Sequence, residues 1–190
     1  AYFFSEKMIF FPPRASYRDE PAIIKLITPN KITIAALHLI NPSATYTVLM
    51  SHGNAEDLGS TYYFLQSWQR HGFSVFAYDY PGYGVSSGMP NEKSTYAATE
   101  AAYQYLTQTL KIPPDKIIVY GRSVGGALAI ELAAKHRVAA VITESAFVSA
   151  FRVMTRYKIL PFDRFDNLSK LKNITAPILF IHGTRDTIVP

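Results

Sequence analysis

Short runs of hydrophobic residues alternate along this chain with longer stretches in which hydrophobic positions recur at helical spacing. The runs at 23–28, 32–39, 47–51, 74–78, 117–120, 139–143 and 178–181 predict strands, and Pro29-Asn30 between the first two predicts a hairpin. The stretches 58–70, 93–110 and 127–134 predict helices. Strands that alternate with helices indicate an α/β fold with a mostly parallel sheet and helices on both faces.

The composition describes an ordinary globular protein. At 190 residues, with 48% hydrophobic and 17% charged residues, the chain is expected to form a single domain over 1–190. It contains no cysteine, and its five histidines have no ligand spacing, so we expect no dedicated metal site. No hydrophobic run reaches the roughly 20 residues of a membrane span, so a cytoplasmic or membrane-associated location is favoured.

A serine flanked by glycines follows the predicted strand at 117–120. The sequence from Gly121 to Gly125 reads G-x-S-x-G and leads into the helix predicted at 127–134, which is the pattern of a nucleophile elbow. Such a turn is strained, and side chains two positions to either side of the serine would collide with the neighbouring strand and helix. Ser123 is therefore the predicted nucleophile, with the helix N-terminus favouring the negative oxygen of a tetrahedral intermediate.

A second motif follows the strand at 47–51 and runs from Ser51 to Gly59. In hydrolases of this architecture the two N–H groups of the oxyanion hole come from the residue after the nucleophile and from the loop after this strand. Val124 and Asn54 are the predicted donors, and His52 is expected to support the loop. The alternative is a simple turn in which Asp57 caps the next helix.

A third motif follows the strand at 178–181 and places Asp186 in the loop downstream of the serine. The expected order of a triad in this architecture is serine, acid, histidine, so Asp186 is the predicted acid that orients the imidazole. Glu144, at the end of the preceding strand, is a less favoured substitute. It is expected instead to be a hydrogen-bonding partner near the elbow.

Together with the segments Phe10–Tyr17 and Tyr78–Gly88, these motifs carry a resemblance that covers nearly the whole chain. The chain resembles the α/β-hydrolase superfamily, and within it the serine-aminopeptidase-like and protein-depalmitoylase-like branch. The resemblance implies a serine hydrolase that cleaves carboxyl esters or thioesters of acyl or lipid-like substrates through an acyl-enzyme, without a cofactor. A peptidase of the same fold and a non-catalytic binding module are the alternatives.

The chain departs from this family's pattern in one respect. The family's catalytic histidine follows the acid, yet no histidine follows Asp186 before the last residue, Pro190. We expect the histidine, a final strand and the last helix to lie beyond Pro190, and the chain alone to be nearly inert. His182 precedes the acid and lies at the end of a strand expected to be buried, which disfavours it as the base. The other histidines, His38, His71 and His136, are expected at the surface or at helix ends.

The net charge of +5 is concentrated in the segment 146–172, where the family places a lid. Its cations are Arg152, Arg156, Lys158, Arg164, Lys170 and Lys172, and aromatic residues accompany them. This composition predicts a small basic lid for an acyl chain or for contact with an anionic membrane surface, although a helix packed on the core with solvated charges is favoured. The chain lacks a nucleic-acid-binding pattern. The glycines of Pro81–Gly88 do not match a dinucleotide fingerprint, because the third is one position late and no helix opens on it.

Overall fold

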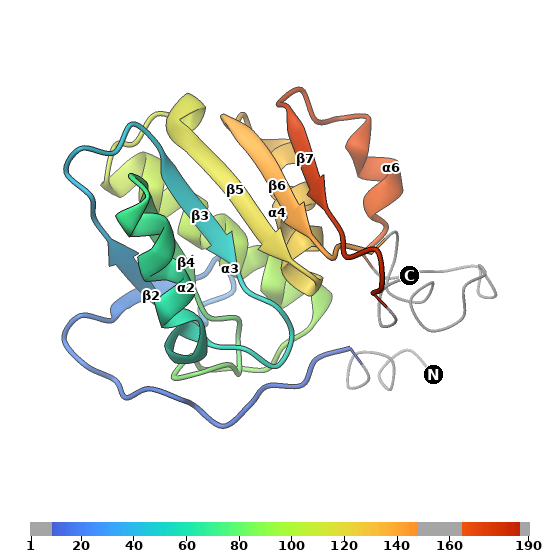
Figure 1. Ribbon diagram of the computed structural model, residues 1–190. Helices are drawn as coiled ribbons and strands as arrows, with labels where there is room; N and C mark the ends of the chain where they lie inside the picture. Colours follow the sequence, from blue (N-terminus) through green and yellow to red (C-terminus); the bar gives the residue numbers. More distant parts are fainter. Residues whose placement is uncertain (1–8, 148–164, 187–190) are drawn as a thin grey trace.

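The computed structural model describes residues 9–147 and 165–186, which contain one seven-stranded sheet (Figure 1). The strands lie in the order β1-β2-β4-β3-β5-β6-β7. Their bounds are β1 Ile24–Ile27, β2 Thr33–Leu39, β3 Thr47–Ser51, β4 Ser74–Tyr78, β5 Ile117–Arg122, β6 Ala140–Glu144 and β7 Ile178–Ile181. The predicted α/β architecture is therefore confirmed, with all seven strands where the hydrophobic runs predicted them to within two residues at each end.

The sheet is parallel apart from its first two strands. β1 pairs antiparallel with β2, and β2 pairs antiparallel with β4, whereas β3 to β7 are all parallel. Ser51, Gly121, Thr143 and Phe180 are aligned across β3, β5, β6 and β7. The arrowheads of these four strands accordingly end along one edge of the sheet (Figure 1), which is where α/β proteins place their ligands.

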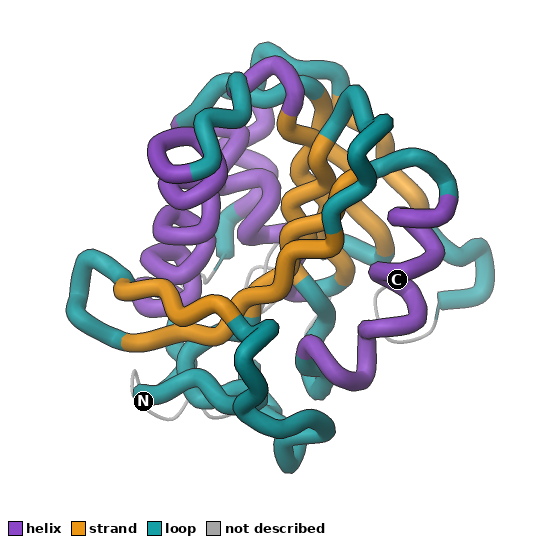
Figure 2. The backbone as a smooth tube through the Cα atoms, turned by 90° about the vertical axis from the view of Figure 1, so that its left-hand side faces the viewer, coloured by secondary structure: helices purple, strands orange, loops and turns teal. Residues whose placement is uncertain are grey.

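Helices lie on both faces of the sheet (Figure 2). Helix α2 (Leu58–Arg70) packs against β2 and β4 on one face, and α3 (Glu92–Gln104) and α4 (Val124–Lys135) pack together on the other. A short helix, α6 (Asn167–Leu171), lies against α4. The described residues also contain two single turns, the π-helical η1 (Tyr105–Thr109) and the 3-10 turn η2 (Pro114–Lys116).

The alternation of side chains along each strand divides the core into two layers. In β3, Leu49 belongs to the layer formed with α3 and α4, whereas Val48 and Met50 belong to the layer formed with α2. All five residues of β3 are buried, as are all five of β4. Both strands lie in the centre of the sheet and are covered on both faces. This is why their sequences are continuous hydrophobic runs and do not alternate with polar residues.

Three local features differ from the sequence predictions. The helix expected to continue to Leu110 changes to a π-helical turn, in which the Leu110 N–H donates to the carbonyl oxygen of Tyr105. Helix α6 occupies part of a stretch expected to be irregular. Strand β7 is exposed, with Leu179, Phe180 and Ile181 all about half accessible, because among the described residues it is the edge strand and pairs with β6 alone.

His38 also differs from its prediction. It lies within β2 and is partly buried, with its ring 5.6 Å from that of Phe76, and is neither a surface nor a helix-end residue. Its Nε2 is buried and has no hydrogen-bond partner in the part of the chain that the structure describes. Burial lowers the pKa of His38, so the neutral ring is favoured.

Candidate active site

Ser123 lies at the sharp turn between β5 and α4. Its backbone has φ 52° and ψ −117°, a conformation that L-residues avoid, and α4 begins at the next residue. Two hydrogen bonds hold this turn: the Ser123 N–H donates to the carbonyl oxygen of Glu144 at 2.8 Å, and its own carbonyl accepts from the Gly126 N–H at 2.9 Å. The side chain of Ser123 is partly exposed at the carboxyl edge of the sheet.

The glycines around Ser123 are required by close backbone contacts. A Cβ on Gly121 would overlap the carbonyl group of Gly125 and lie 2.5 Å from the nitrogen of Gly126. A Cβ on Gly125 would lie 2.6 Å from the carbonyl oxygen of His52 and closer still to that of Ser51. The predicted collisions with strand and helix are therefore present, and Gly125 brings the start of α4 directly against the end of β3.

The loop between β3 and α2, residues 52–57, lies beside this turn and is anchored by Asn54. The Asn54 Oδ1 accepts hydrogen bonds from the Phe11 N–H at 2.9 Å and from the Tyr83 hydroxyl at 2.6 Å. Its Nδ2 donates to the carbonyl oxygen of Ile9. The side chain of Asn54 thus fastens the N-terminal segment, residues 9–17, to the β3–α2 loop, while its backbone N–H donates to none of the described residues.

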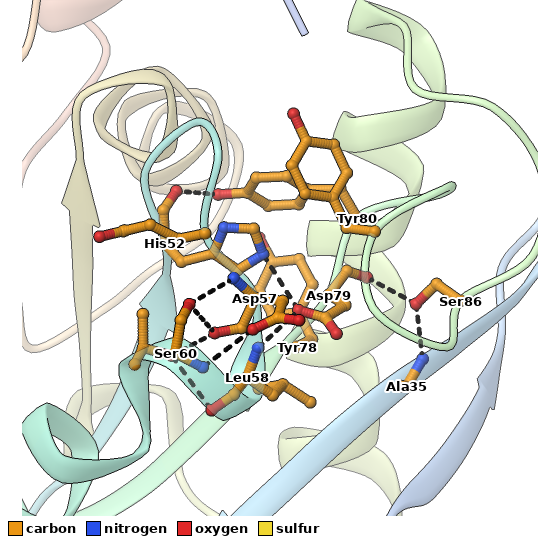
Figure 3. A network of polar contacts seen from close by, with 12 residues as sticks. Ala35, His52, Asp57, Leu58, Ser60, Tyr78, Asp79, Tyr80 and Ser86 are labelled. Atoms are coloured by element: carbon orange, nitrogen blue, oxygen red, sulfur yellow. Dashed lines mark hydrogen bonds and ion pairs between the residues drawn. The ribbon is translucent and has the colours of Figure 1, made fainter. Parts of the chain in front are cut away.

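His52 is buried beneath the same loop, as expected for a residue that supports it (Figure 3). Its Nδ1 lies 2.8 Å from the carbonyl oxygen of Gly53, and its Nε2 lies 3.2 Å from Oδ1 of Asp79. Its ring stacks on Tyr80, with centroids 4.1 Å apart, and the Tyr80 hydroxyl donates to the His52 carbonyl oxygen. His52 is therefore enclosed, with Nδ1 against the Gly53 carbonyl, one ring face against Tyr80, and Nε2 facing Asp79 at 3.2 Å without forming a hydrogen bond to the described residues.

Asp79 joins this loop to the N-terminal segment. It is fully buried, and its Oδ1 also accepts the Leu58 N–H at 2.9 Å, while its Oδ2 accepts a hydrogen bond from the Tyr17 hydroxyl. Burial, together with the Asp79 charge, raises the pKa of Tyr17, so its hydroxyl remains a donor. Gly84 allows this arrangement, because at its φ of +51° a Cβ would lie 2.6 Å from the Tyr17 hydroxyl oxygen. The sequence motifs gave no role to Asp79, although the segment that contains it was part of the resemblance.

Asp57 caps helix α2, as the alternative interpretation of this motif predicted for this residue. Its carboxylate accepts the Ser60 N–H at 2.8 Å and the Ser16 N–H at 2.7 Å, and also the Ser16 hydroxyl. Burial would raise the pKa of Asp57, but these hydrogen bonds outweigh it and lower the pKa below its usual range. The cap therefore also ties the N-terminal segment to the start of α2.

Asp186 lies in the turn that follows β7, on the same edge of the sheet. Its N–H donates to the carbonyl oxygen of Gly183 at 3.0 Å, and its side chain is largely buried. The Nε2 of His182 lies 3.9 Å from its Oδ2, which is beyond hydrogen-bond distance, and His182 is exposed. Glu144 accepts a hydrogen bond from the Tyr120 hydroxyl, as expected for a partner near the elbow.

Most of the predicted lid, residues 148–164, lies outside the described residues, and with it Arg152, Arg156, Lys158 and Arg164. Lys170 is described and is engaged within the protein: its Nζ lies 2.7 Å from Oε2 of Glu131 and 2.7 Å from the Tyr96 hydroxyl. Two hollows of roughly 500 Å³ are formed by described residues, one between α3 and α4 and one beside the start of α2, and neither is lined by Ser123.

No group of three or more histidine or acidic side chains is placed to hold a metal ion within residues 9–147 and 165–186. None of the helices in those residues is long and apolar enough to cross a membrane.

A serine on a strained strand-to-helix turn, at the carboxyl edge of a sheet of this order, defines the α/β-hydrolase class. The sequence profile of the alpha/beta hydrolase fold family matches residues 46–167, and the chain belongs to this family. It is 43% identical over 152 residues to human alpha/beta hydrolase domain-containing protein 17B and equally to the mouse protein 17C. These alignments cover 78% of this chain but 53% and 47% of the relatives, so the chain spans about half the length of the curated relatives it matches.

Solved structures show the same fold at low sequence identity. The esterase Pf2001 of Pyrococcus furiosus superposes with a TM-score of 0.77 at 20% identity, covering 94% of this chain and 79% of the esterase. Est1E of Butyrivibrio proteoclasticus, solved with ferulic acid bound, superposes with a TM-score of 0.68 at 18% identity. The superposition covers 87% of this chain and 80% of Est1E.

Proposed function

We propose that this chain carries the nucleophile and oxyanion hole of a serine hydrolase that cleaves carboxyl esters or thioesters. Ser123 is the nucleophile, Asp186 is the acid, and the N–H groups of Asn54 and Val124 form the oxyanion hole. The observation that carries the proposal is the backbone of Ser123, which is held at φ 52° between two glycines that no larger residue could replace. Strain of this kind persists where the surrounding structure maintains it and is concentrated at functional sites.

Two backbone donors beside Ser123 support the oxyanion hole. The Val124 N–H is at the first position of α4, so it has no acceptor within the helix. Neither this N–H nor that of Asn54 donates to a residue that the structure describes. The contact of Gly125 with Ser51 and His52 brings the two strand ends together. Donors of this kind act at about 2.7–3.1 Å from the oxygen of the tetrahedral intermediate.

In the proposed reaction, Ser123 Oγ attacks the acyl carbon and gives its proton to a histidine base. The carbonyl oxygen becomes an oxyanion that the Asn54 and Val124 N–H groups bind. The intermediate then expels the alcohol or thiol, which takes the proton from the histidine, and water hydrolyses the acyl-serine by the same steps. Asp186 would orient the histidine and stabilise its charged form.

We propose that the histidine base comes from a segment outside this chain, which spans about half the length of the relatives it matches. His182 does not suit this role, because it precedes the acid, is exposed and lies 3.9 Å from it. His52 does not suit it either, because both of its ring nitrogens face oxygen atoms of Gly53 and Asp79. A base on a later segment agrees with the chain order of the triad in this class.

The substrate class rests on similarity and composition. The structural neighbour Pf2001 is an esterase, and Est1E binds ferulic acid; both favour ester or thioester substrates over peptides for this chain. Contact of the basic segment 146–172 with an anionic membrane surface remains part of the proposal, and binding of the protein to vesicles containing phosphatidylserine would test it. A peptidase is distinguished by assaying p-nitrophenyl butyrate, an acyl thioester and an aminoacyl p-nitroanilide side by side.

Labelling with a fluorophosphonate probe tests the proposed function. The probe would be applied to this chain and to the longer protein, each beside its Ser123→Ala variant. We expect the longer protein to label through Ser123 and this chain to label at least about a thousandfold more slowly, since a serine without its base loses most of its reactivity. Absence of labelling in both would refute the hydrolase proposal and favour a non-catalytic binding module.

A further inference from the structure

Arg122, the residue between Gly121 and the proposed nucleophile, connects the elbow to the β3–α2 loop. Its guanidinium forms an ion pair with Oε1 of Glu56 and lies over the ring of Phe64, with 5.7 Å between its Cζ and the ring centroid. Both charged side chains are partly buried, at 30% and 26% exposure. The position is variable in the G-x-S-x-G pattern, so the motif itself assigns Arg122 no role.

Glu56 carries this connection on to the residue that precedes Asn54. Its second carboxylate oxygen, Oε2, accepts the Gly53 N–H at 2.7 Å. The fit is close, because a Cβ on Gly53 would lie 2.9 Å from that oxygen. Arg122, Glu56 and Gly53 therefore form a continuous bridge from the residue before Ser123 to the residue before Asn54.

The turn that this bridge spans is strained. Ala55 has φ 58°, which costs a residue with a Cβ about 1–2 kcal/mol. A turn that holds such a residue keeps its shape only if its surroundings constrain it. The Glu56 carboxylate closes the turn on one side, and the guanidinium of Arg122 fixes that carboxylate in place. The three hydrogen bonds of Asn54 already described are made by its side chain, whereas this bridge acts on the backbone of the loop from the elbow side.

We propose that Arg122 is a positioning residue: acting through Glu56, it sets the placement of the Asn54 N–H relative to the Val124 N–H. The inference rests on the proposed function, since it concerns the same oxyanion hole. Arg122 and Val124 flank Ser123 in the chain. The ion pair from Arg122 to Glu56 therefore holds the β3–α2 loop in a fixed position relative to the Val124 N–H. The effect falls on the transition state, because the oxyanion forms only there, and misplacement by about 1 Å can cost 100-fold.

The test compares Arg122→Met and Glu56→Gln with their double variant in the longer protein that contains the whole hydrolase domain. Methionine keeps an apolar stem against Phe64, and glutamine keeps an oxygen acceptor for Gly53, so each removes mainly the ion pair. We expect each substitution to lower kcat for p-nitrophenyl butyrate by about tenfold with KM changed less than about twofold. The double variant should be no worse than either single variant, and Arg122→Lys should recover part of the loss.

Lys25→Met is the matched control, because it removes an ion pair to Asp19, 2.7 Å long and distant from the elbow, and it should leave kcat unchanged. Thermal unfolding of every variant separates positioning from stability: a lowered Tm with unchanged kcat would overturn the inference. Additive losses in the double variant would overturn it too. Failure of the unsubstituted protein to label at Ser123 would refute the proposed function together with this inference, whereas unchanged kcat in the variants refutes the inference alone.

Discussion

Gly125, in the first turn of α4, packs against the carbonyl oxygen of Ser51 at the end of β3 so closely that a Cβ there would overlap it. This contact is between backbones, so neither partner can yield by changing a rotamer. It places the elbow and the β3–α2 loop side by side. The second glycine of the motif is therefore a requirement of packing between two elements, and it lies 74 residues from Ser51 in the chain.

Gly125→Ala should consequently destabilise the protein. We expect the free energy of unfolding to fall by about 1–3 kcal/mol or more, as for other insertions into a closely packed region. Gly183→Ala is the control, because its nearest neighbour would be Asp186 Cβ at an ordinary 3.8 Å. Urea unfolding of both variants measures the difference, and equal stability of the two would contradict the close packing of α4 on β3.

Asn54→Ala should release the N-terminal segment. The substitution removes the acceptor for the Phe11 N–H and the donor to the Ile9 carbonyl. We expect faster amide hydrogen exchange at Phe11 and a loss of about 1–3 kcal/mol in unfolding free energy. Asn41→Ala provides the control, because Asn41 links Ser43 and Gln69 in a similar way far from this segment. If exchange at Phe11 were equally slow in both variants, the anchoring role of Asn54 would be wrong.

Asp57→Asn should weaken the protein at neutral pH and less so in acid. The pKa of Asp57 is lowered in the folded state, so its charged form stabilises the fold above the ordinary value of 3.8. That stabilisation is lost as the pH falls below 3.8 and through the lower, folded-state pKa. Asparagine retains a capping oxygen but never a charge. Urea unfolding from pH 7 to about pH 3 should show the gap between the two proteins closing, and a constant gap would contradict the prediction.

His38→Leu should reduce the loss of stability in mild acid. Burial lowers the pKa of His38 below its ordinary value of 6.5. As the pH falls below 6.5, this histidine is therefore protonated more readily in the unfolded chain than in the folded protein. Its contribution to stability is therefore greatest above pH 6.5 and declines as the pH falls below that value toward the folded-state pKa. Between about pH 7 and pH 5 the unfolding free energy of His38→Leu should fall less steeply than that of the unsubstituted protein.

The exposed His71 at the end of α2 supplies the comparison for this measurement. His71→Leu should leave the steeper decline in place, because His71 lies outside the core and its Nδ1 faces the Ser67 carbonyl. A decline that disappeared in His71→Leu and persisted in His38→Leu would assign the titration to the end of α2 instead of β2 and refute the prediction.

The sequence by itself determined the elements and the elbow. Periodicity located α2 at Leu58–Arg70 and β3 at Thr47–Ser51 without error, because the side chains of each element face a fixed layer of the core. The elbow was predictable because strand, turn and helix are contiguous: a Cβ on Gly121 would collide with the backbone of Gly125 within the motif itself, although the need for Gly125 comes from the distant carbonyl groups of Ser51 and His52. His38 was misplaced because a polar residue on a predicted strand gives no sign of which neighbours will cover it.

Only the tertiary structure decided what holds the β3–α2 loop in place. Tyr17 and Asp79 meet across 62 residues of chain, and Phe11 and Asn54 across 43. No local pattern specifies such partners, because a carboxylate or an amide can satisfy its hydrogen bonds with any donor the fold brings within about 3 Å. The same is true of Arg122 and Glu56, whose pairing exists because parallel strands β3 and β5 end at one edge of the sheet.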